Sequence, residues 1–528
     1  MDKTYPIDIH GVKRYGVEKW LDDYYIPVTG MEYYSIYYKV KTTYMELLKE
    51  NQNDLVYWIG LSNIGIIRSL SMCILELLAL SRLKKGGYKY IFGKENVEII
   101  EDISTYNSPF LNNRSSLIVK SFAELNFYKR VKNILRTVGY NFRSLSLCNK
   151  NFIRDISNPY FFIGERSHQE VVSFCDENKI SPLCMSPMLF VKNNTNNFES
   201  NYKTSCLIEF VNCFLHIVKN HYPIINDLVL ECIRKEINEI FKLSFSFFCQ
   251  NVRVFSNFKP KKLLITGLGN PIHRLFSSAL RYTGSEVIGF SHGNAYIHSF
   301  HPEIFTELST VDLFVSSSRG HKKIAKQAVK EFSLELRNCK ITFIKNNFYI
   351  PLFRKLQKDI PVKKIKKIMV VGSILTSYFP AYTEYHTFAF LYNDLKLVKL
   401  LKRSGYYVIY KPRLDAINEV KSVFEVYADR VIINKFEDVY HYADCLLFSN
   451  LYSTTFGFSL LTNKPIVLMN VKGYYWYPRA FELVKKRCSV IEAEAVDGKI
   501  VFDEKELLNA IEDSINNINY DILYEFAF

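Results

Sequence analysis

The chain has 528 residues, of which 48% are hydrophobic and 23% charged, and it contains a modest 21 Gly and 16 Pro. This length and composition exclude a disordered or fibrous protein and predict two or three globular domains. Lys and Arg outnumber Asp and Glu by 68 to 53, a formal charge of +15 that favours anionic partners such as nucleotide phosphates, an acidic polymer, nucleic acid or a membrane surface, unless it only reflects genome composition.

Targeting and redox features favour a protein that stays in a reducing compartment. The first residues lack the apolar core of a secretory signal. The most apolar stretch, residues 64–80, is interrupted by Arg68 and Glu76 and is shorter than the ~20 residues of a membrane span, which predicts a buried helix. Eleven cysteines occur without a Cys-x-x-Cys pair, as is typical of free thiols. We expect a cytoplasmic protein that contacts a membrane, if at all, peripherally at its inner face.

The first predicted unit follows a tyrosine-rich stretch, residues 1–50, to which we assign no structure. Its elements are a strand at 54–59, a helix at 66–84 and a strand at 88–92. This order is that of a βαβ unit, and open α/β sheets bind ligands at the carboxyl ends of their strands. Ser62 and Asn63 in its turn are therefore candidates for the acceptor or phosphate side of a site. The turn lacks a full Gly-x-Gly-x-x-Gly motif, so it is a weak dinucleotide signature.

The next part of the chain alternates strands and helices around a helical insertion. The predicted elements are a strand at 159–163, a helix at 167–177, an apolar segment at 180–185, a helix at 225–248, a strand at 263–266, a helix at 272–281, strands at 286–290 and 311–315, and a helix through residue 330. Apolar residues in 225–248 recur every three or four positions, which predicts one face directed at the core.

A second α/β series begins after a segment that contains Pro351, Pro361 and the basic run 363–367, which we interpret as the crossing between two domains. Its elements are strands at 368–371, 407–410 and 431–433, a helix at 387–403, and a last helix from Glu504 that Asp503 caps. The predicted fold class is α/β, with two Rossmann-like doubly wound domains facing across a cleft. Residues 1–345 form the acceptor-side domain with the helical insertion, and residues 346–528 form the nucleotide-donor domain.

The strongest local signal lies within residues 443–469. A buried strand there is followed by the hydroxyl-rich turn Ser453, Thr454 and Thr455, a short helix and another buried strand. Such a turn offers hydroxyls and free backbone N–H groups at a helix N-terminus, where phosphates bind. We predict that the turn binds the phosphate of a nucleotide donor; the alternative is a helix cap alone.

Two cations, Lys411 and Arg413, flank Pro412 directly after the strand at 407–410. Their place at a strand's carboxyl end predicts that they point at the same donor phosphate, and the alternative is ordinary surface charge.

A histidine follows the strand at 286–290. His292 could act as general base for an acceptor hydroxyl or hydrogen-bond a phosphate, and the alternative is a structural histidine that holds the turn. Asn294, in the same turn, is a further candidate for the acceptor or phosphate side. His298 and His301 come next, but their spacing is not a metal-ligand pattern, so we expect no metal.

These motifs carry a resemblance to a known group of enzymes. The turn 291–293 with Ser316 and Ser317 resembles the His-Gly turn, residues 411–412 resemble the Lys-Pro motif, and residues 443–467 resemble the Ala-Asp … Ser-Thr … Lys-Pro segment of bacterial surface-polysaccharide transferases. The families are capsule Kdo-transferase-like and teichoic-acid glycerophosphotransferase-like enzymes, both of the two-Rossmann GT-B type. The resemblance covers about residues 260–475. Arg413 departs from it, because the relatives have His there.

The resemblance implies donor-phosphate contacts from Lys411 and the turn 453–455, an acceptor-side or phosphate-side role for His292, and no metal. The expected function is a glycosyltransferase that moves a sugar from a nucleotide-sugar to a bacterial surface glycan, such as capsule or lipopolysaccharide. The expected partners are the nucleotide-activated sugar, as substrate without any further cofactor, and a glycan or lipid-linked acceptor, but no nucleic acid, for which no recognition motif is present. The alternatives are a CDP-polyol phosphotransferase of the same fold, or a non-catalytic or epimerase-type nucleotide-sugar-binding protein.

Overall fold

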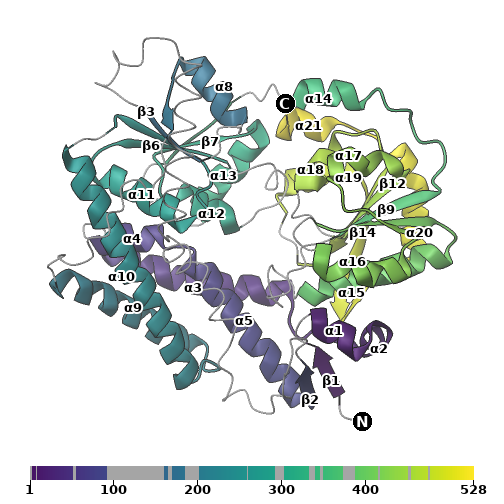
Figure 1. The fold of residues 1–528 in the computed structure, drawn as a ribbon, viewed down its shortest axis with the longest axis horizontal. Helices are drawn as coiled ribbons and strands as arrows, with labels where there is room; N and C mark the ends of the chain where they lie inside the picture. The colour runs from purple at the N-terminus through teal and green to yellow at the C-terminus, as the bar shows by residue number, and fades with distance from the viewer. Residues whose placement is uncertain are drawn as a thin grey trace.

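Two parallel β-sheets, each with helices around it, dominate the computed structural model (Figure 1). The structure describes residues 3–6, 9–51, 55–91, 160–164, 169–184, 201–257, 260–291, 302–331, 339–344, 349–372, 387–413, 417–449, 454–473 and 476–527. The first sheet has six strands and the second has seven. This arrangement confirms the fold class predicted from the sequence, two doubly wound α/β units with a helical insertion in the first.

The seven-stranded sheet has the order β11-β10-β9-β12-β13-β14-β15. Its strands are β9 (Lys367–Val371), β10 (Tyr407–Lys411), β11 (Arg430–Val431), β12 (Cys445–Phe448), β13 (Ile466–Val471), β14 (Ser489–Val496) and β15 (Lys499–Val501). All neighbours are parallel except the β14–β15 pair at the edge. Counted from β9, the first six strands have the order 3-2-1-4-5-6 found in dinucleotide-binding Rossmann sheets, which reverses direction between β9 and β12.

Helices connect these strands, as expected for parallel neighbours. They are α15 (Thr387–Arg403), α16 (Ile417–Tyr427), α17 (Phe436–Val439), α18 (Thr454–Leu460) and α19 (Pro478–Arg487), and α20 (Glu504–Asp513) follows the last strand. The Asp503 cap is confirmed, because its Oδ1 accepts from the backbone N–H groups of Lys505 and Glu506. The central strands β12 and β13 are buried along their whole length, which explains their unbroken apolar sequences.

The six-stranded sheet is parallel throughout, with the order β4-β3-β5-β6-β7-β8. Its strands are β3 (Tyr160–Ile163), β4 (Leu183–Cys184), β5 (Lys262–Ile265), β6 (Glu286–Phe290), β7 (Leu313–Ser316) and β8 (Lys340–Phe343), and its helices are α8 (Gln169–Asn178), α11 (Pro271–Tyr282), α12 (Pro302–Leu308) and α13 (Arg319–Glu331). Alternate strand residues enter two different hydrophobic clusters, so both faces of the sheet are covered.

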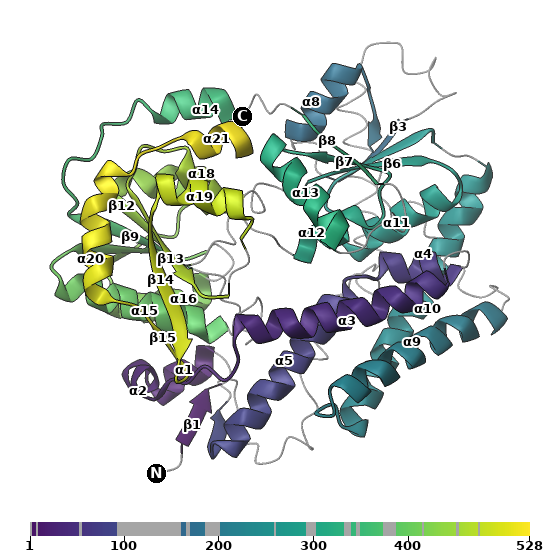
Figure 2. The same ribbon diagram turned by 180° about the vertical axis from the view of Figure 1, so that it is seen from behind.

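A layer of long helices lies beside the six-stranded sheet (Figure 2). It consists of α3 (Gly30–Glu50), α4 (Leu55–Ser62), α5 (Ile66–Lys85), α9 (Asn201–His221) and α10 (Asp227–Asn257). Helices α9 and α10 are the predicted insertion between β4 and β5. The strand predicted at 54–59 is wrong, because residues 55–62 form helix α4. Almost every side chain of α4 is buried, and an all-apolar run of this length fits a buried helix as well as a strand.

The strand predicted at 88–92 exists as β2 (Tyr88–Ile91), but it does not belong to either large sheet. It pairs in parallel with β1 (Lys3–Pro6), in the stretch to which we assigned no structure. The predicted βαβ unit at 54–92 is therefore wrong: α4 and α5 form a helix pair whose helical partners include α3, α9, α10 and α11.

Each end of the chain contacts the opposite half of the molecule. Near the N-terminus, helices α1 (Ile9–Tyr15) and α2 (Val17–Asp23) lie against the seven-stranded unit: Glu18 pairs with Lys399, and the ring of Tyr24 stacks on Tyr392. At the other end, helix α21 (Asp521–Phe526) packs on α13, where Glu525 pairs with Lys323. The domain boundary predicted after residue 345 falls in the connection between the two sheets and stays a prediction.

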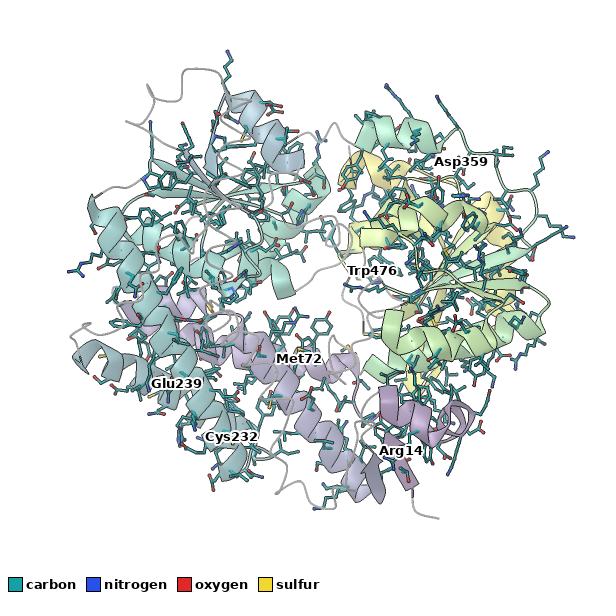
Figure 3. All side chains as sticks on the ribbon, viewed as in Figure 1. Arg14, Met72, Cys232, Glu239, Asp359 and Trp476 are labelled. Carbon is teal, nitrogen blue, oxygen red and sulfur yellow. The ribbon has the colours of Figure 1, made fainter. Side chains whose placement is uncertain are left out.

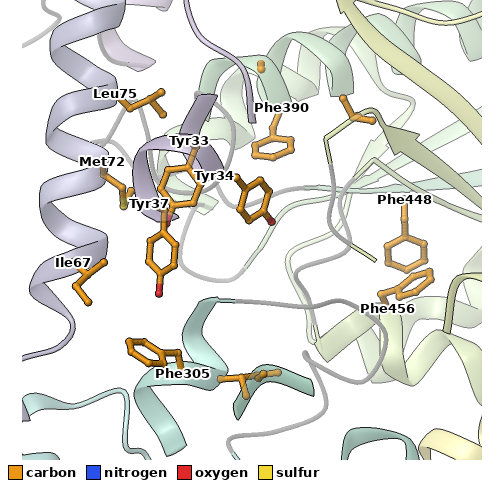
Figure 4. Packing of buried hydrophobic residues seen from close by; sticks show 14 of the residues in the cluster. Tyr33, Tyr34, Tyr37, Ile67, Met72, Leu75, Phe305, Phe390, Phe448 and Phe456 are labelled. Atoms are coloured by element: carbon orange, nitrogen blue, oxygen red, sulfur yellow. The ribbon is translucent and has the colours of Figure 1, made fainter. Parts of the chain in front are cut away.

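One hydrophobic cluster extends through both units (Figure 4). It joins buried tyrosines of α3 and apolar side chains of α5 to Phe305 of α12, and it continues to Phe390 of α15, Phe448 of β12 and Phe456 of α18. The two units therefore share one continuous hydrophobic core among the described residues.

Candidate functional site

The residues that the sequence predicts as a donor site lie at or after the carboxyl ends of β10 and β12 in the seven-stranded sheet. The strand order places the ends of β9 and β12 side by side and the end of β10 next to β9. Sheets of this kind bind ligands at the point where the strand order reverses. Lys411 is the last residue of β10, and the predicted phosphate turn follows β12.

The buried carboxylate of Asp394 connects the ends of β10 and β12. Asp394 of α15 is fully buried, and its Oδ2 accepts a hydrogen bond from the Tyr410 hydroxyl at 3.0 Å while its Oδ1 accepts one from Ser449 Oγ at 2.5 Å. Tyr410 also stacks on Phe424, with 3.4 Å between ring centroids. Burial and the neighbouring Asp394 raise the pKa of Tyr410 well above its ordinary value, so the hydroxyl keeps its proton. The carboxylate thereby fixes the ends of β10 and β12 relative to each other.

Gly372 closes the same edge after β9, and no larger residue fits there. A Cβ atom at this position would lie 2.5 Å from the Tyr410 hydroxyl oxygen. The backbone N–H of Gly372 donates a hydrogen bond of 2.9 Å to the Lys411 carbonyl. The glycine lets β9 and β10 approach closely at their ends.

Lys411 carries a buried ammonium group at this edge. The residue is 4% exposed, and its Nζ donates a hydrogen bond of 2.7 Å to the Pro412 carbonyl. An ammonium has three N–H donors, and no carboxylate of the described residues lies within ion-pair distance of this one. Burial lowers the pKa of Lys411 below its ordinary value, while the charge of Glu437 acts in the opposite direction. A bound anion would accept from the remaining donors and favour the charged form of Lys411.

The other predicted donor residues follow the ends of β10 and β12. Arg413 follows β10 and is half-buried, Thr454 begins helix α18, and Thr455 is half-buried in its first turn. Ser453 lies outside the described residues. Helix α18 has seven residues, so its dipole is short, and a phosphate here would depend mainly on hydroxyl and backbone N–H donors.

A second buried lysine of the same sheet lies at the opposite edge. Lys464 precedes β13, is 7% exposed, and donates from Nζ to the Ala443 carbonyl before β12 at 2.8 Å. Burial lowers its pKa as well. The two lysines share burial and chemistry, but only Lys411 lies at the ligand-binding edge.

The six-stranded sheet has an equivalent edge, at which His292 and Asn294 after β6 are the residues predicted from the sequence. Its order reverses between β3 and β5, which are followed by Gly164 and Thr266. Gly164 has φ of +126°, and a Cβ there would lie 1.8 Å from the Thr266 hydroxyl. The turn 267–271, predicted from the sequence only as the end of a strand, leads into α11, where Asn270 Oδ1 accepts a hydrogen bond from the Ile272 backbone N–H.

Arg274 of α11 holds this turn against helix α4. Its guanidinium is buried and donates to the carbonyls of Ser62 at 2.7 Å, Leu268 at 2.6 Å and Gly269 at 2.9 Å. Burial lowers the pKa of Arg274 to about 10. The Ser62 carbonyl lies at the negative C-terminal end of α4, where a cation is favoured.

Ser62 and Asn63 lie where this packing leaves no room for a ligand. Both are buried at the junction of α4 and α5: the Ser62 hydroxyl donates to the Trp58 carbonyl and contacts Ser278 Oγ, and the Asn63 amide donates to the Ile59 carbonyl and accepts from Ser244. The βαβ turn that made them candidates does not exist. Their hydrogen bonds give them a structural role in the helical layer.

The histidine turn of the first unit lies outside the described residues, so His292 and Asn294 stay predictions. The neighbouring strand ends are described and are rich in hydroxyls. Ser291 after β6 is fully buried, and Ser317 after β7 lies 3.3 Å from Nδ1 of His321, an α13 residue that the sequence analysis did not single out. Ser318 caps α13 by accepting from the His321 backbone N–H.

His321 should make the stability of the fold depend on pH. Burial lowers its pKa to about 4, with the charge of Glu170 opposing the shift. Between pH 6.5 and 4 the imidazole of His321 is protonated in the unfolded chain but neutral in the native state, so the free energy of unfolding falls as the pH falls. From pH 7 to pH 5 this loss should be about 2 kcal/mol for this group. Urea unfolding of wild type and His321→Gln at both values measures it.

The variant should show a smaller loss between the two pH values than wild type. His216→Gln, at an exposed position on α9, is the control and should keep the wild-type slope. Parallel profiles for wild type and His321→Gln would show that His321 titrates normally.

Comparisons with known proteins give a weak structural likeness. No protein-family model and no curated protein matches the chain. A crystal structure of a UDP-N-acetylglucosamine 2-epimerase aligns at 11% identity with a TM-score of 0.30, over 68% of this chain and 82% of that one. The UDP-N-acetylglucosamine 2-epimerase from Rickettsia bellii aligns at 12% identity with a TM-score of 0.34, over 69% and 89%. The fold assignment therefore rests on the strand orders given above.

Two further features concern the predicted metal and membrane properties. Within the described ranges, no group of three or more His, Cys, Asp or Glu side chains is arranged to hold a metal ion. In the same ranges no single helix has the length and apolar character of a membrane span. Helices α4 and α5 reach that length and apolar character only when taken together, and they are bent by 58° relative to each other.

Proposed function

We propose that this protein is a glycosyltransferase that moves a sugar from a nucleotide-sugar donor to a bacterial surface glycan. The observation that carries the proposal is the buried Lys411 ammonium beside the point where a Rossmann-ordered sheet reverses direction; among the described residues it donates only to the Pro412 carbonyl. A phosphate is the anion that such an edge most often binds. The first unit, with its own doubly wound sheet, would hold the acceptor.

The transfer needs stabilisation of charge on both sides of the sugar. The bond from the anomeric carbon to the donor phosphate oxygen breaks, and the electron pair leaves with the nucleotide. The acceptor hydroxyl forms the new bond and gives its proton to a base. Lys411, Arg413 and the turn 453–455 would stabilise the departing phosphate, and His292 would take the proton.

A ligand panel tests the donor site, and the products test the reaction. In a thermal-shift series of CMP-, CDP-, UDP- and GDP-linked sugars, one base series should raise the melting temperature, because a ligand that binds only the native state stabilises it. With isotope-labelled donor, label transferred to glycan supports a glycosyltransferase. A phosphodiester product would indicate the polyol phosphotransferase, an epimerised sugar would indicate the epimerase, and binding without turnover would indicate a binding protein.

Removing the hydroxyls of Ser453 and Thr454 from the turn should weaken donor binding. We expect Ser453→Ala combined with Thr454→Ala to raise the donor dissociation constant about tenfold, which corresponds to about 1.4 kcal/mol, with little change in melting temperature. Isothermal titration measures the dissociation constants of the donor and of the free nucleoside.

A matched control lies at the other end of α18. Ser459 and Thr462 are buried, and their hydroxyls bond to backbone carbonyls of the same segment. Replacing these two with Ala should lower stability and leave donor affinity unchanged. Normal donor binding by the folded Ser453/Thr454 double variant would reduce the turn to a helix cap.

A further inference from the structure

A basic surface segment connects the two units between helix α14 (Tyr349–Leu356) and strand β9. Residues 354–367 contain seven cations and one carboxylate, that of Asp359. All seven cations are exposed: Arg354, Lys355, Lys358, Lys363, Lys364, Lys366 and Lys367. We call residues 354–367 the basic segment.

The charge of the basic segment is not neutralised by the protein. Among the described residues, none of its seven cationic side chains lies within ion-pair distance of a carboxylate, although exposed lysines elsewhere, such as Lys402 and Lys472, are paired. Asp444 approaches the segment, but it accepts hydrogen bonds from the backbone N–H groups of Lys366 and Lys367. Seven like charges therefore face solvent together, which favours an extended anionic partner.

The segment also presents an apolar side chain at its apex. Ile360 is 85% exposed, more than any other large hydrophobic residue of the described chain. It is followed by the exposed Pro361 and lies between the two groups of cations.

Contacts on both sides hold this apex in place. Leu356 and Ile365 are buried on either side of it. The carboxylate of Asp359 accepts from the Tyr440 hydroxyl at 2.6 Å, and its carbonyl accepts from the Asn463 amide at 2.5 Å. The apolar side chain is thus fixed toward solvent.

The basic segment lies on the outer side of the seven-stranded unit, away from the six-stranded one (Figures 1 and 3; Asp359 is labelled in Figure 3). It ends at Lys367, the first residue of β9, whereas the candidate donor site lies past the other end of that strand, at Gly372. A partner on the basic segment would therefore leave the candidate donor site open.

We propose that the basic segment docks this protein on an anionic lipid bilayer, with the lysines on the headgroups and Ile360 inserted at the interface. Clustered Lys and Arg are attracted to anionic leaflets, and an apolar side chain that inserts into the bilayer adds to the binding affinity. A dissolved polyanion has no apolar interior into which Ile360 could insert. The proposal does not depend on the reaction that the protein catalyses.

The test is vesicle co-sedimentation of the full chain. Wild type should bind vesicles of phosphatidylcholine mixed with phosphatidylglycerol, bind phosphatidylcholine alone weakly, and lose binding as salt is raised. Replacing Lys355, Lys358, Lys363 and Lys364 with Gln should weaken binding at least fivefold, and Ile360→Ser should also weaken it at low salt, where wild type binds.

Two matched controls separate the segment from general charge and apolarity. Lys235, Lys261, Lys326 and Lys505 are exposed on four other parts of the molecule, and replacing them with Gln removes the same net charge. Val426 is 75% exposed on α16 and is the control for Ile360. Both control variants should bind like wild type.

Three results would overturn the proposal. The first is no preference of wild type for anionic vesicles, and the second is an equal loss in the four-lysine control. The third is tighter binding to nucleic acid or an acidic polysaccharide than to vesicles, together with no effect of Ile360→Ser, which would assign the segment to a soluble polyanion.

Discussion

His292→Ala should lower the turnover rate by about 10²–10⁴-fold, the range typical of a lost general base, and change donor affinity only a few-fold. The residue directly follows Ser291 at the end of β6 in the first unit, whereas the candidate donor site lies in the second. A base that acts on the acceptor therefore affects turnover more than donor binding. Steady-state kinetics at saturating donor, together with donor titration, measures the two quantities separately.

Two variants make this result interpretable. His292→Gln keeps a hydrogen-bonding group but cannot take up a proton, so it should be as slow as the Ala variant. His216→Ala on α9 is the control for loss of a histidine and should be fully active. Near-normal turnover of His292→Gln would make His292 a positioning residue, and Glu303 and Glu307 would be the next candidates for the base. A collapse of donor affinity with normal turnover at saturation would assign His292 to the phosphate site.

Lys411→Met should raise the dissociation constant of the nucleotide-sugar about 10- to 100-fold and change that of the free nucleoside less than twofold. A hydrogen bond to a charged group contributes about 1.5–3 kcal/mol, and only the donor carries the phosphate that would accept it. Met keeps most of the length and volume of the buried side chain, so the fold should persist. Isothermal titration with the donor and the nucleoside is the measurement.

Lys464→Met is the matched control, because it removes an equally buried ammonium from the same sheet at its opposite edge. It should lower the melting temperature as much as Lys411→Met or more, and leave donor affinity unchanged. Equal weakening of donor and nucleoside by Lys411→Met, or equal donor loss in both variants, would show that Lys411 acts through folding.

Parallel strands were the part of the fold that the sequence predicted best. Strands buried on both faces need apolar residues at every position, so β6, β9, β12 and β13 appear as short apolar runs bounded by turn residues. The same pattern failed at residues 55–62, because a helix buried on all sides needs the same composition. The spacing of apolar residues therefore could not distinguish α4 from a strand. In the structure this segment is a helix that packs against α10 and α11.

The sequence by itself determined which residues follow each strand: Lys411 and Arg413 after β10, and the hydroxyl-rich turn after β12. It did not determine that β9 lies between those strands, because strand order depends on which non-local pairings form. Nor could it show that Lys411 is buried, that Asp394 ties Tyr410 to Ser449, or that Ser62 and Asn63 are enclosed. Those properties depend on residues up to 216 positions apart, as in the contact of Ser62 with Ser278, and only the tertiary structure brings such partners within hydrogen-bond distance.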